Sequence, residues 1–434
     1  MNILVAVEEL RFGGAQTFAL RLAQALHESG HQVWLYTLYA NLTETELVRR
    51  LAPDVPVLAY RPALPTVDHL LQRTENWLER RGWRLNWRQQ SLVRHLRKCL
   101  RDHAIDVVSS NTFKSDEVMA LALSEPGLSK VPLVITMHGD YEQFWAFHQQ
   151  GGAYVLPNYQ QRLTQTLSRA SGVVYLADQN LTVLNPAIVP PAATKHLRRR
   201  RIYNGLEGRL SSEHPRYTRQ ALGIPAEALI FGMVARGVAE KGWKPVLEAF
   251  AQLKAEPGLS RPVHLVLVGA SPHLDELGQA YAANDHIHFL GFVNNPVDCV
   301  GAFDVGILAS SLKESLPNSI AEYLYGGKAV ISTEVGEIRN MLRPVLDVDA
   351  PAEANEELAG LLVPFPPAGH LASSHELYVA MRRYVAEPNL LTQHQAIAQL
   401  AFRKFDMGQC VAAYQSFYLS CQATMAPVAL AIDN

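Results

Sequence analysis

Cysteine is scarce in this chain. Its four cysteines, Cys99, Cys299, Cys410 and Cys421, lie far apart and form no CxxC pair. This pattern suits a reducing cytoplasm better than a disulfide-stapled secreted fold. A strong net charge is also missing, because the formal value is −2 at pH 7. The charge balance therefore gives no reason to expect nucleic acid as a partner.

Long apolar runs are also lacking. No stretch approaches the roughly 18 apolar residues that a membrane-spanning helix needs. The N-terminus, MNILVAVEEL, has no basic segment and reaches Glu8 and Glu9 after a few apolar residues, so we interpret it as a first strand and not as a signal peptide. These features predict a soluble or peripheral protein in the cytoplasm. The next turn contains GG and not GxGxxG, which disfavours a dehydrogenase.

The composition is that of a globular protein with two domains. The length of 434 residues exceeds one ordinary domain, and 48% of the residues are hydrophobic against 18% charged. Apolar runs alternate with helical segments, which predicts parallel sheets with helices on both faces. In the first half we expect a helix at 17–30 that buries Phe18, Leu20, Leu22, Ala23 and Leu26, and strands at 2–7, 31–38, 105–109, 133–137 and 172–177.

The same pattern begins again after residue 202. There we expect strands at 229–236, 264–269, 287–292, 305–310 and 329–333, and a last amphipathic helix near the C-terminus. The fold class is therefore α/β, with two Rossmann-like doubly wound domains facing a cleft. Because ligands of such sheets bind beyond the carboxyl ends of the strands, we expect the functional residues to follow the strands.

Two features of the first domain follow strands. In Arg11–Gln16, Gly13 and Gly14 let the backbone approach a bulky ligand and lead into a helix N-terminus, which favours anions. In MHGD at 137–140, His138 is a candidate for handling protons or donating hydrogen bonds in the cleft. A tight turn and a histidine satisfied by local backbone are the structural alternatives, and each feature alone is weak.

In the second domain, RGVAEKG at 236–242 places two cations five residues apart after a strand. This spacing lets Arg236 and Lys241 converge on one anion, with arginine supplying a planar fork and lysine a point charge. The structural alternative is an exposed loop in which Glu240 pairs with Lys241.

The stretch ESLPNSIAE at 314–322 places one carboxylate before a helix and another inside it. Pro317 suits the first helical position, and Leu316 would then be an N-cap without a side-chain acceptor. The N–H groups of Asn318 and Ser319 would be available to an anion. Glu322 would then accept hydrogen bonds from ribose, and Glu314, in the loop, would hold a sugar.

Two other interpretations of this stretch stay open. The two carboxylates could act as the acid and base of a glycosidase, although that ignores the cation pair and the uncapped helix. A helix with incidental surface glutamates is the structural alternative.

The order GGAQ, HG, R-x4-K, E-x7-E and GGKAVISTEVG resembles the retaining GT-B glycosyltransferases of the family-4 type, the glycosyl transferases group 1. The resemblance covers nearly the whole chain, and its specific part is E-x7-E with its proline, preceded by R-x4-K. It implies an acceptor domain at 1–204, a nucleotide-sugar domain at 205–404, and a final helix at 405–425 that returns to the first domain. IYNGL at 202–206 resembles the family's linker, and AGLLVPFPP at 359–367 resembles the loop after the donor site.

The resemblance also implies roles for single residues. Arg236 and Lys241 would bind the donor diphosphate, Glu322 the ribose and Glu314 the transferred sugar. His138 would lie near that sugar. The remaining implied donor-binding positions are Gly13, Gly14, Phe292, Ser315, Leu316, Pro317, Asn318 and Ser319.

The sequence departs from the family pattern after STEVG. Glu337 and Asn340 stand where the family often has a second glycine and then a glutamate, and the insertion RPVLDVDAPAEANEEL follows. These departures bear on the shape of the sugar pocket. We interpret the Asp347–Asp349 DVD as chance because it lies in an acidic insertion, and we expect no metal and no cofactor.

The implied reaction is hexosyl transfer of class EC 2.4 with retention, from a UDP- or GDP-sugar to a glycan or lipid-linked acceptor, in cell-surface polysaccharide or glycoconjugate synthesis. Arg236, Lys241 and the helix dipole would stabilise the leaving diphosphate. A sugar-nucleotide epimerase of the same fold and a catalytically silent donor-binding scaffold are the alternatives.

Residues 77–101 concentrate arginine and tryptophan. The stretch holds seven arginines and one lysine against the single acid Glu79, and Trp77, Trp83 and Trp87 interleave with them. This suits peripheral contact with an anionic membrane on the cytoplasmic side, and a solvated basic helix pair is the equally weighted alternative. A metal site from His95, Cys99 and His103 is disfavoured because eight helical residues span roughly 12 Å.

Overall fold

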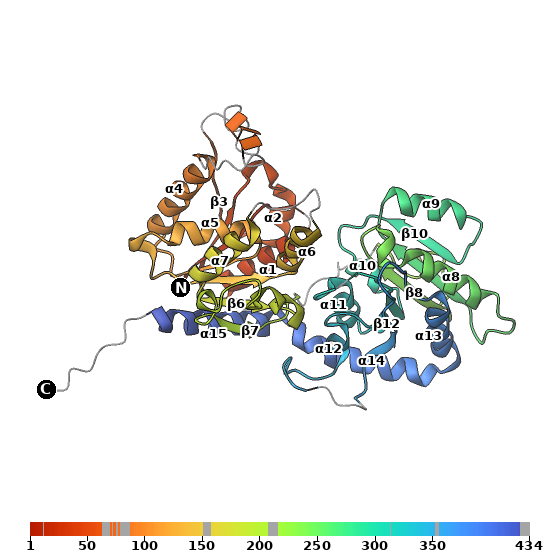
Figure 1. Cartoon of the computed structure of the whole chain (residues 1–434). Coiled ribbons are helices and arrows are strands. Elements are labelled where there is room, and N and C mark those ends of the chain that lie inside the picture. The colour runs from red at the N-terminus through yellow and green to blue at the C-terminus, as the bar shows by residue number, and fades with distance from the viewer. Residues whose placement is uncertain are drawn as a thin grey trace. The chain divides into compact units, whose positions relative to one another are not determined.

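The computed structural model of this chain describes residues 1–11, 13–62, 70–71, 73–74, 77–78, 87–150, 158–206, 216–312, 314–351 and 356–425. The chain forms two compact units (Figure 1). Unit 1 comprises Met1–Gly205 and Met407–Asn434, and unit 2 comprises Leu206–Asp406. The chain thus leaves unit 1 once and returns to it after unit 2.

Within the described residues, unit 1 contains a seven-stranded parallel sheet in the order β3-β2-β1-β4-β5-β6-β7. Its strands are β1 (Asn2–Val7), β2 (Gln32–Thr37), β3 (Val57–Ala59), β4 (Val107–Ser110), β5 (Leu133–Met137), β6 (Gly172–Tyr175) and β7 (Arg198–Arg201). The chain runs outward from β1 to β3 and then returns to pair β4 with β1. This reversal is the topological switch point at which doubly wound sheets bind ligands.

Helices cover both faces of this sheet, as the strand alternation requires. Ile3, Val5 and Val7 of β1 join one core with α1 (Gly14–Glu28) and α15 (Met407–Met425). Leu4 and Ala6 join the opposite core, with α4 (Trp87–Asp102), α5 (Phe113–Leu123) and α7 (Tyr159–Arg169). Unit 1 also contains α2 (Thr45–Leu51) and α6 (Asp140–Gln150). The C-terminal helix begins at Met407 and not at 405, because Arg403–Phe405 form a 3-10 turn and Asp406 is extended.

In the part of unit 2 that the structure describes, a six-stranded parallel sheet has the order β10-β9-β8-β11-β12-β13. Its strands are β8 (Leu229–Val234), β9 (Val263–Val268), β10 (Ile287–Gly291), β11 (Val305–Leu308), β12 (Ala329–Thr333) and β13 (Gly360–Val363). Its helices include α8 (Trp243–Lys254), α9 (Pro272–Ala280), α10 (Val297–Val300), α11 (Asn318–Tyr325), α12 (Ile338–Leu342), α13 (Ser374–Ala386) and α14 (Pro388–Phe402). The predicted α/β class, with a Rossmann-like doubly wound sheet in each unit, is confirmed. Among the described helices, none is long and apolar enough to cross a membrane.

Three histidines of unit 2 lie in contact: His264 on β9, His286 just before β10 and His288 on β10. His264 Nδ1 lies 3.0 Å from His288 Nε2, and His264 Nε2 lies 3.4 Å from His286 Nδ1. Burial lowers the pKa of His264 to about 4, helped by His286, His288 and Lys254 of α8. The pKa values of His286 and His288 are also lowered, chiefly by burial, whereas Asp285 acts in the opposite direction on His286. The fold therefore favours the neutral form of all three imidazoles.

These three contacting histidines predict that unit 2 loses stability in acid. The unfolded chain takes up a proton at His264 near pH 6.5, whereas the folded chain resists protonation down to about pH 4. The contribution of His264 to stability is therefore present above pH 6.5 and is lost as the pH falls through this window. Between pH 7 and pH 5 we expect the melting temperature of unit 2 to fall a few °C further in the wild type than in His264→Gln. Equal pH slopes in the two proteins, measured by circular dichroism, would contradict the prediction.

Candidate active site

The sequence-predicted residues of unit 2 gather at the carboxyl edge of its sheet. Arg236 follows β8, Glu314 follows β11, and Gly336 follows β12. Because β8, β11 and β12 are parallel neighbours, their carboxyl ends share one edge. Residues 70 to 100 positions apart in sequence are thereby brought together.

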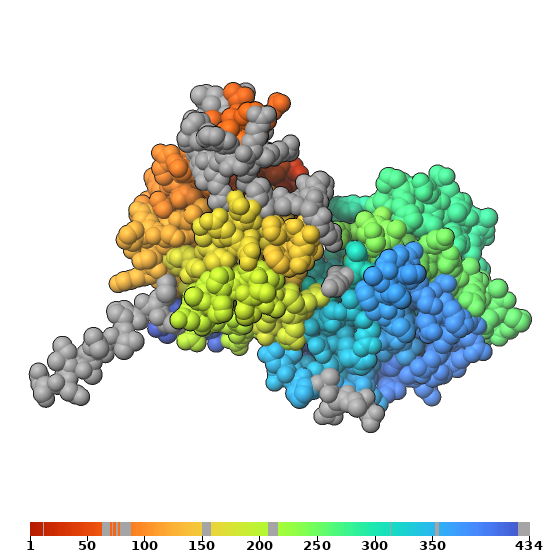
Figure 2. Space-filling model, viewed as in Figure 1, coloured from red at the N-terminus to blue at the C-terminus, as the bar shows by residue number. Residues whose placement is uncertain are grey.

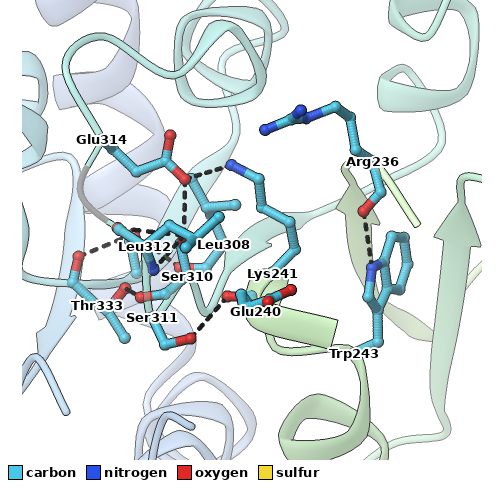
Figure 3. Close-up of polar contacts among 11 residues, drawn as sticks. Arg236, Glu240, Lys241, Trp243, Leu308, Ser310, Ser311, Leu312, Glu314 and Thr333 are labelled. Atoms are coloured by element: carbon cyan, nitrogen blue, oxygen red, sulfur yellow. Dashed lines mark hydrogen bonds and ion pairs between the residues drawn. The ribbon is translucent and has the colours of Figure 1, made fainter. Parts of the chain in front are cut away.

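Lys241 and Glu314 form an ion pair at this edge (Figure 3). Their side chains are only 10% and 12% exposed, and Ser310 Oγ also donates to Glu314 Oε1 over 2.7 Å. The alternative pairing of Lys241 with Glu240 is wrong. The loop holds Glu240 by its backbone instead, since the Ser311 N–H donates to Glu240 O over 2.7 Å. The lysine and the first carboxylate of E-x7-E thus form one unit.

Arg236 extends toward the same place. Its backbone carbonyl accepts a hydrogen bond of 3.0 Å from Trp243 Nε1, which fixes the start of the loop after β8. Its side chain is exposed, and Figure 3 shows the guanidinium directed toward the Lys241 ammonium. Two cations near each other with one carboxylate leave a net positive charge, which suits an anion with two or more charges.

Helix α11 begins at Asn318, and its N-cap is Pro317. The prediction of Leu316 as N-cap and Pro317 as first helical residue was therefore one position early. Pro317 adopts φ −68° and ψ 120°, an extended conformation, so the helical turn starts only after it. Among the described residues no side-chain cap is formed at its N-cap, and Ser315, Asn318, Ser319 and Glu322 lie half-buried around its first turns. The backbone N–H groups of an uncapped first turn favour an anion.

Tyr323 fixes α11 on the sheet. Its buried hydroxyl donates to Ile307 O over 3.1 Å and accepts from the Val234 N–H over 2.8 Å. Gly306 of β11 provides the room, because a Cβ there would overlap with the tyrosine ring. The N-terminus of α11 is therefore held at a fixed height above β8 and β11.

Gly336 closes the site from the β12 side. Its φ of +58° lies in the left-handed region, and a Cβ at this position would overlap with the carbonyl oxygen of Glu314. Just beyond it, Glu337 is buried and accepts a hydrogen bond of 2.8 Å from Asn340 Nδ2. The two residues that depart from the family pattern are thus bonded to each other.

Phe292 follows β10 at the same edge. Its side chain is 64% exposed, and the preceding Gly291 accepts a hydrogen bond of 2.9 Å from the Gly269 N–H. A large exposed ring on a loop fixed by backbone bonds is able to stack on a planar group.

The other predicted residues lie at the carboxyl edge of the unit 1 sheet. Gly13 is the N-cap of α1, which has no side-chain cap, and Gly14 is its first residue. His138 follows β5, with its ring against Phe18 of α1 and its Nε2 atom 3.4 Å from Asn111 Oδ1. Burial lowers the pKa of His138 to about 4, so the ring is neutral at pH 7 and suits hydrogen bonding more than charge.

Sequence reasoning missed the carboxylate beside His138. The Asp140 Oδ2 atom accepts a hydrogen bond of 2.6 Å from the Phe113 N–H at the start of α5, and burial raises the pKa of Asp140 to about 7. The neighbouring Asp116 is fully buried and accepts a hydrogen bond of 2.5 Å from Tyr141 Oη. The signal for Asp140 was present in MHGD, whereas nothing in the sequence marks Asp116.

Two family models match this chain. Residues 12–191 match "Glycosyltransferase Family 4", and residues 216–349 match "Glycosyl transferases group 1". The chain belongs to this glycosyltransferase family. It is an enzyme of class EC 2.4 that transfers a sugar from a nucleotide-sugar. No curated protein matches its sequence significantly.

Solved structures show that this glycosyltransferase has a GT-B-like fold. Anabaena HepE in complex with UDP-glucose has a TM-score of 0.67 at 20% identity, covering 97% of this chain and 100% of that one. Sucrose-phosphate synthase from Thermosynechococcus elongatus has a TM-score of 0.67 at 17% identity, covering 98% and 100%. A Rickettsia africae glycosyltransferase has a TM-score of 0.67 at 16% identity, covering 97% and 98%.

The acidic insertion of this glycosyltransferase is organised by an arginine. Arg343 is buried and donates to Glu356 Oε2 over 2.5 Å and to the carbonyls of Ala350 and Pro351. The Asp349 N–H donates to Asp347 Oδ1 over 3.0 Å, as in an ordinary turn. Within the described ranges, no group of three His, Cys, Asp or Glu residues is arranged to hold a metal ion.

Proposed function

We propose that this glycosyltransferase retains the anomeric configuration of its donor sugar and uses the carboxyl edge of unit 2 to bind the nucleotide diphosphate. The observation that carries the proposal is the Lys241–Glu314 pair, with Arg236 directed toward it and the uncapped α11 beside it. This edge offers two cations and free backbone donors to the diphosphate. It offers Glu314 to the hydroxyls of the transferred sugar.

The leaving diphosphate is the centre of the proposed mechanism. As its bond to the sugar breaks, negative charge grows on the diphosphate, and Arg236, Lys241 and the N-terminus of α11 stabilise it. The same diphosphate oxygen takes the proton of the acceptor hydroxyl on the face from which it leaves. This route needs no protein nucleophile and no metal ion.

We assign the remaining donor contacts from the positions that these residues take in the family pattern. Glu322, one turn into α11, accepts hydrogen bonds from the ribose, and Phe292 stacks on the base. The backbone of Ser315, Leu316 and Pro317 lies along the sugar and phosphates. In unit 1, the α1 N-terminus at Gly13 and Gly14 serves the phosphates, and neutral His138 serves the sugar. The acceptor is a glycan or a lipid-linked sugar in cell-surface polysaccharide or glycoconjugate synthesis.

A thermal-shift screen tests the donor. UDP-sugars, GDP-sugars, UDP and GDP would each be added to the purified chain without metal and with EDTA. A ligand at about 100 times its Kd adds roughly 2.7 kcal/mol of stability, so the true donor should give a clear rise in melting temperature. Turnover of that donor only with an added acceptor supports transfer, whereas sugar-nucleotide interconversion without an acceptor would replace it with epimerase chemistry.

We predict that substitutions of the two carboxylates of E-x7-E impair different steps, nucleotide binding for Glu322 and turnover for Glu314. Glu322→Gln removes a charged acceptor from the ribose and should weaken binding of the free nucleotide roughly 10- to 100-fold. Glu314→Gln should lower turnover and leave binding of the free nucleotide near the wild-type value, because Glu314 contacts the sugar. Titration calorimetry with UDP or GDP measures the first effect, and Glu376→Gln on the exposed start of α13 is the control. Unchanged nucleotide affinity in Glu322→Gln would contradict the ribose role.

We also propose that the enzyme is cytoplasmic and contacts an anionic membrane through residues 77–101. Part of this stretch, including Arg80, Arg81, Trp83 and Arg84, lies outside the described residues. On α4, three of its bases are already paired with acids: Arg97 and Arg101 with Glu125, and Lys98 with Asp102. Arg88→Gln with Arg94→Gln, which removes two further cations of α4, should reduce sedimentation with anionic liposomes. Unchanged sedimentation would contradict it.

A further inference from the structure

Ser310 lies where β11 opens into the loop that carries Glu314. It is two positions beyond Leu308, the last residue of the strand, and it is fully buried. Helices shield the sheet of unit 2: the face that Figure 2 shows is formed by green segments around α8 and α9 and blue segments around α13 and α14. A buried serine has lost its water partners, so its hydroxyl forms its hydrogen bonds within the protein.

The Ser310 hydroxyl has one proton and two acceptors within reach. The Glu314 Oε1 atom lies 2.7 Å from Ser310 Oγ, and the Leu312 carbonyl oxygen lies 3.4 Å from it. The proton goes to the carboxylate, because that contact is shorter and a charged acceptor forms the stronger bond. The hydroxyl oxygen in turn accepts a hydrogen bond of 3.2 Å from the Leu312 N–H. The hydroxyl thus acts both as a donor and as an acceptor.

The backbone of Ser310 is held by the neighbouring strand. Thr333, the last residue of β12, is buried, and its Oγ1 atom donates to Ser310 O over 2.7 Å. Figure 3 shows Thr333 on one side of Ser310 and Glu314 on the other. The position of the Ser310 hydroxyl is therefore set by the end of the sheet and not by the loop that carries Glu314.

Both donors to Glu314 use the same carboxylate oxygen. Lys241 Nζ pairs with Oε1, and Ser310 Oγ donates to Oε1. Figure 3 shows the second oxygen, Oε2, turned away from both donors. Oε2 is therefore the oxygen that this arrangement leaves for a hydroxyl of a substrate.

A lysine alone would not fix the orientation of a carboxylate. The ammonium group acts as a point charge, which attracts either oxygen, and the last torsion of a glutamate side chain has a broad energy minimum. A hydrogen bond is directional, and the Ser310 hydroxyl reaches Oε1 from a fixed position. The serine therefore selects which oxygen pairs with Lys241 and which oxygen faces away.

We propose that Ser310 is a positioning residue for the transfer reaction, because it fixes the Glu314 carboxylate with Oε2 facing the transferred sugar. This rests on the proposed function, in which Glu314 binds the hydroxyls of that sugar. Ser310 is fully buried, so it acts through Glu314 and not on the substrate. A carboxylate that is already oriented needs no reorganisation as the transition state forms, which is how a residue behind the site raises the rate.

Kinetics and calorimetry of Ser310→Ala in the full chain test this role. We expect turnover of the nucleotide-sugar found by the thermal-shift screen to fall roughly 10- to 100-fold, the range that a hydrogen bond to a charged group contributes. The affinity for free UDP or GDP should equal that of the wild type, because neither contains the transferred sugar. A general loosening of the site would weaken both.

The matched control is Ser332→Ala. Ser332 on β12 is an equally buried serine, but its Oγ donates to the backbone carbonyl of Leu308 over 2.8 Å and not to Glu314. We expect this variant to keep wild-type turnover. Equal losses in Ser310→Ala and Ser332→Ala would mean that any buried hydroxyl at this end of the sheet matters, and would overturn the proposal.

A double-variant cycle separates positioning from a purely structural role. If Ser310 acts through Glu314, adding Ser310→Ala to Glu314→Gln causes no further loss, so the double variant should turn over at the rate of Glu314→Gln. Losses that multiply would show that the two residues act independently and would overturn the proposal. Ser310→Cys keeps a similar shape with a weaker donor, so it should lie between the wild type and Ser310→Ala. It takes the place of Ser310→Ala in the cycle if melting curves show that the alanine variant is unfolded.

The same assay distinguishes failure of the serine's role from failure of the proposed function. Wild-type turnover in Glu314→Gln would reject the role of Glu314 and, with it, that of Ser310. Loss of turnover in Glu314→Gln together with wild-type turnover in Ser310→Ala would reject the positioning role alone.

Discussion

Replacing Arg236 by alanine is expected to reduce turnover of the nucleotide-sugar roughly 30- to 1000-fold. The reason is the loss of about 2–4 kcal/mol of stabilisation of the leaving diphosphate. The fold should be retained, because the side chain is exposed and the bond from Trp243 is made to the backbone carbonyl, which alanine keeps. Steady-state kinetics with the donor identified by thermal shift measures the effect. Lys244→Ala, an exposed lysine on α8, is the control and should remain near wild type.

Lys241→Ala should lose as much turnover and also destabilise unit 2. Its removal leaves Glu314 in a nearly buried place, with Ser310 as its one hydrogen-bond donor among the residues that the structure describes. Breaking a pair of this kind costs up to about 3 kcal/mol, which lowers the melting temperature by several °C. The double variant Lys241→Met with Glu314→Gln removes both charges and should recover stability without recovering turnover. Near-normal kinetics in both Arg236→Ala and Lys241→Ala would reject the diphosphate assignment.

Gly336→Ala is expected to have the largest effect of any single methyl group added to the site. The alanine Cβ would overlap with the Glu314 carbonyl, and a left-handed backbone costs an L-residue roughly 1–2 kcal/mol. Because the neighbouring atom is backbone, relief requires the loop that carries Glu314 to move. We expect turnover to fall at least about 100-fold, together with a lower melting temperature.

Gly369→Ala is the control that separates the cost of backbone strain from the effect of the close contact with Glu314. Gly369 has a similar φ of +79°, but a Cβ there has no neighbour within 4 Å. It should therefore show only the backbone cost of about 1 kcal/mol and normal turnover. If Gly336→Ala behaved like Gly369→Ala in both kinetics and melting, the tight contact with Glu314 would not matter for the reaction.

Strands with continuous apolar runs could be predicted from the sequence. The runs at Leu133–Met137 and Ala329–Thr333 coincide with β5 and β12, because strands buried on both faces admit little except apolar side chains. The missed strands lack this signal. Strand β7 consists of arginines, β3 has three residues, and β13 lies in a segment interpreted as a loop. All three lie at sheet edges, which are half-solvated, so their pattern is weaker, although the edge strand β10 was predicted.

The residues of the site could be predicted from the sequence, but the contacts between them could not. The spacing of R-x4-K and E-x7-E identifies Arg236, Lys241 and Glu314. That Lys241 pairs with Glu314, and not with the adjacent Glu240, depends on β8 lying beside β11 in the sheet. The buried Asp116 and the contact of Gly336 with Glu314 are likewise set by packing between distant segments, which periodicity does not encode.

The return of α15 to unit 1 has a consequence for synthesis of the chain on the ribosome. Tyr414, Phe417 and Tyr418 fill the core beneath β1 and β6, yet they are translated after all of unit 2. The N-terminal unit therefore emerges first but with an apolar gap on one side of its sheet, whereas unit 2 is complete as soon as Asp406 has left the exit tunnel. Unit 1 thus completes its core only after all of unit 2 has been translated. Until the last helix arrives, the nascent N-terminal unit is a natural client for chaperones.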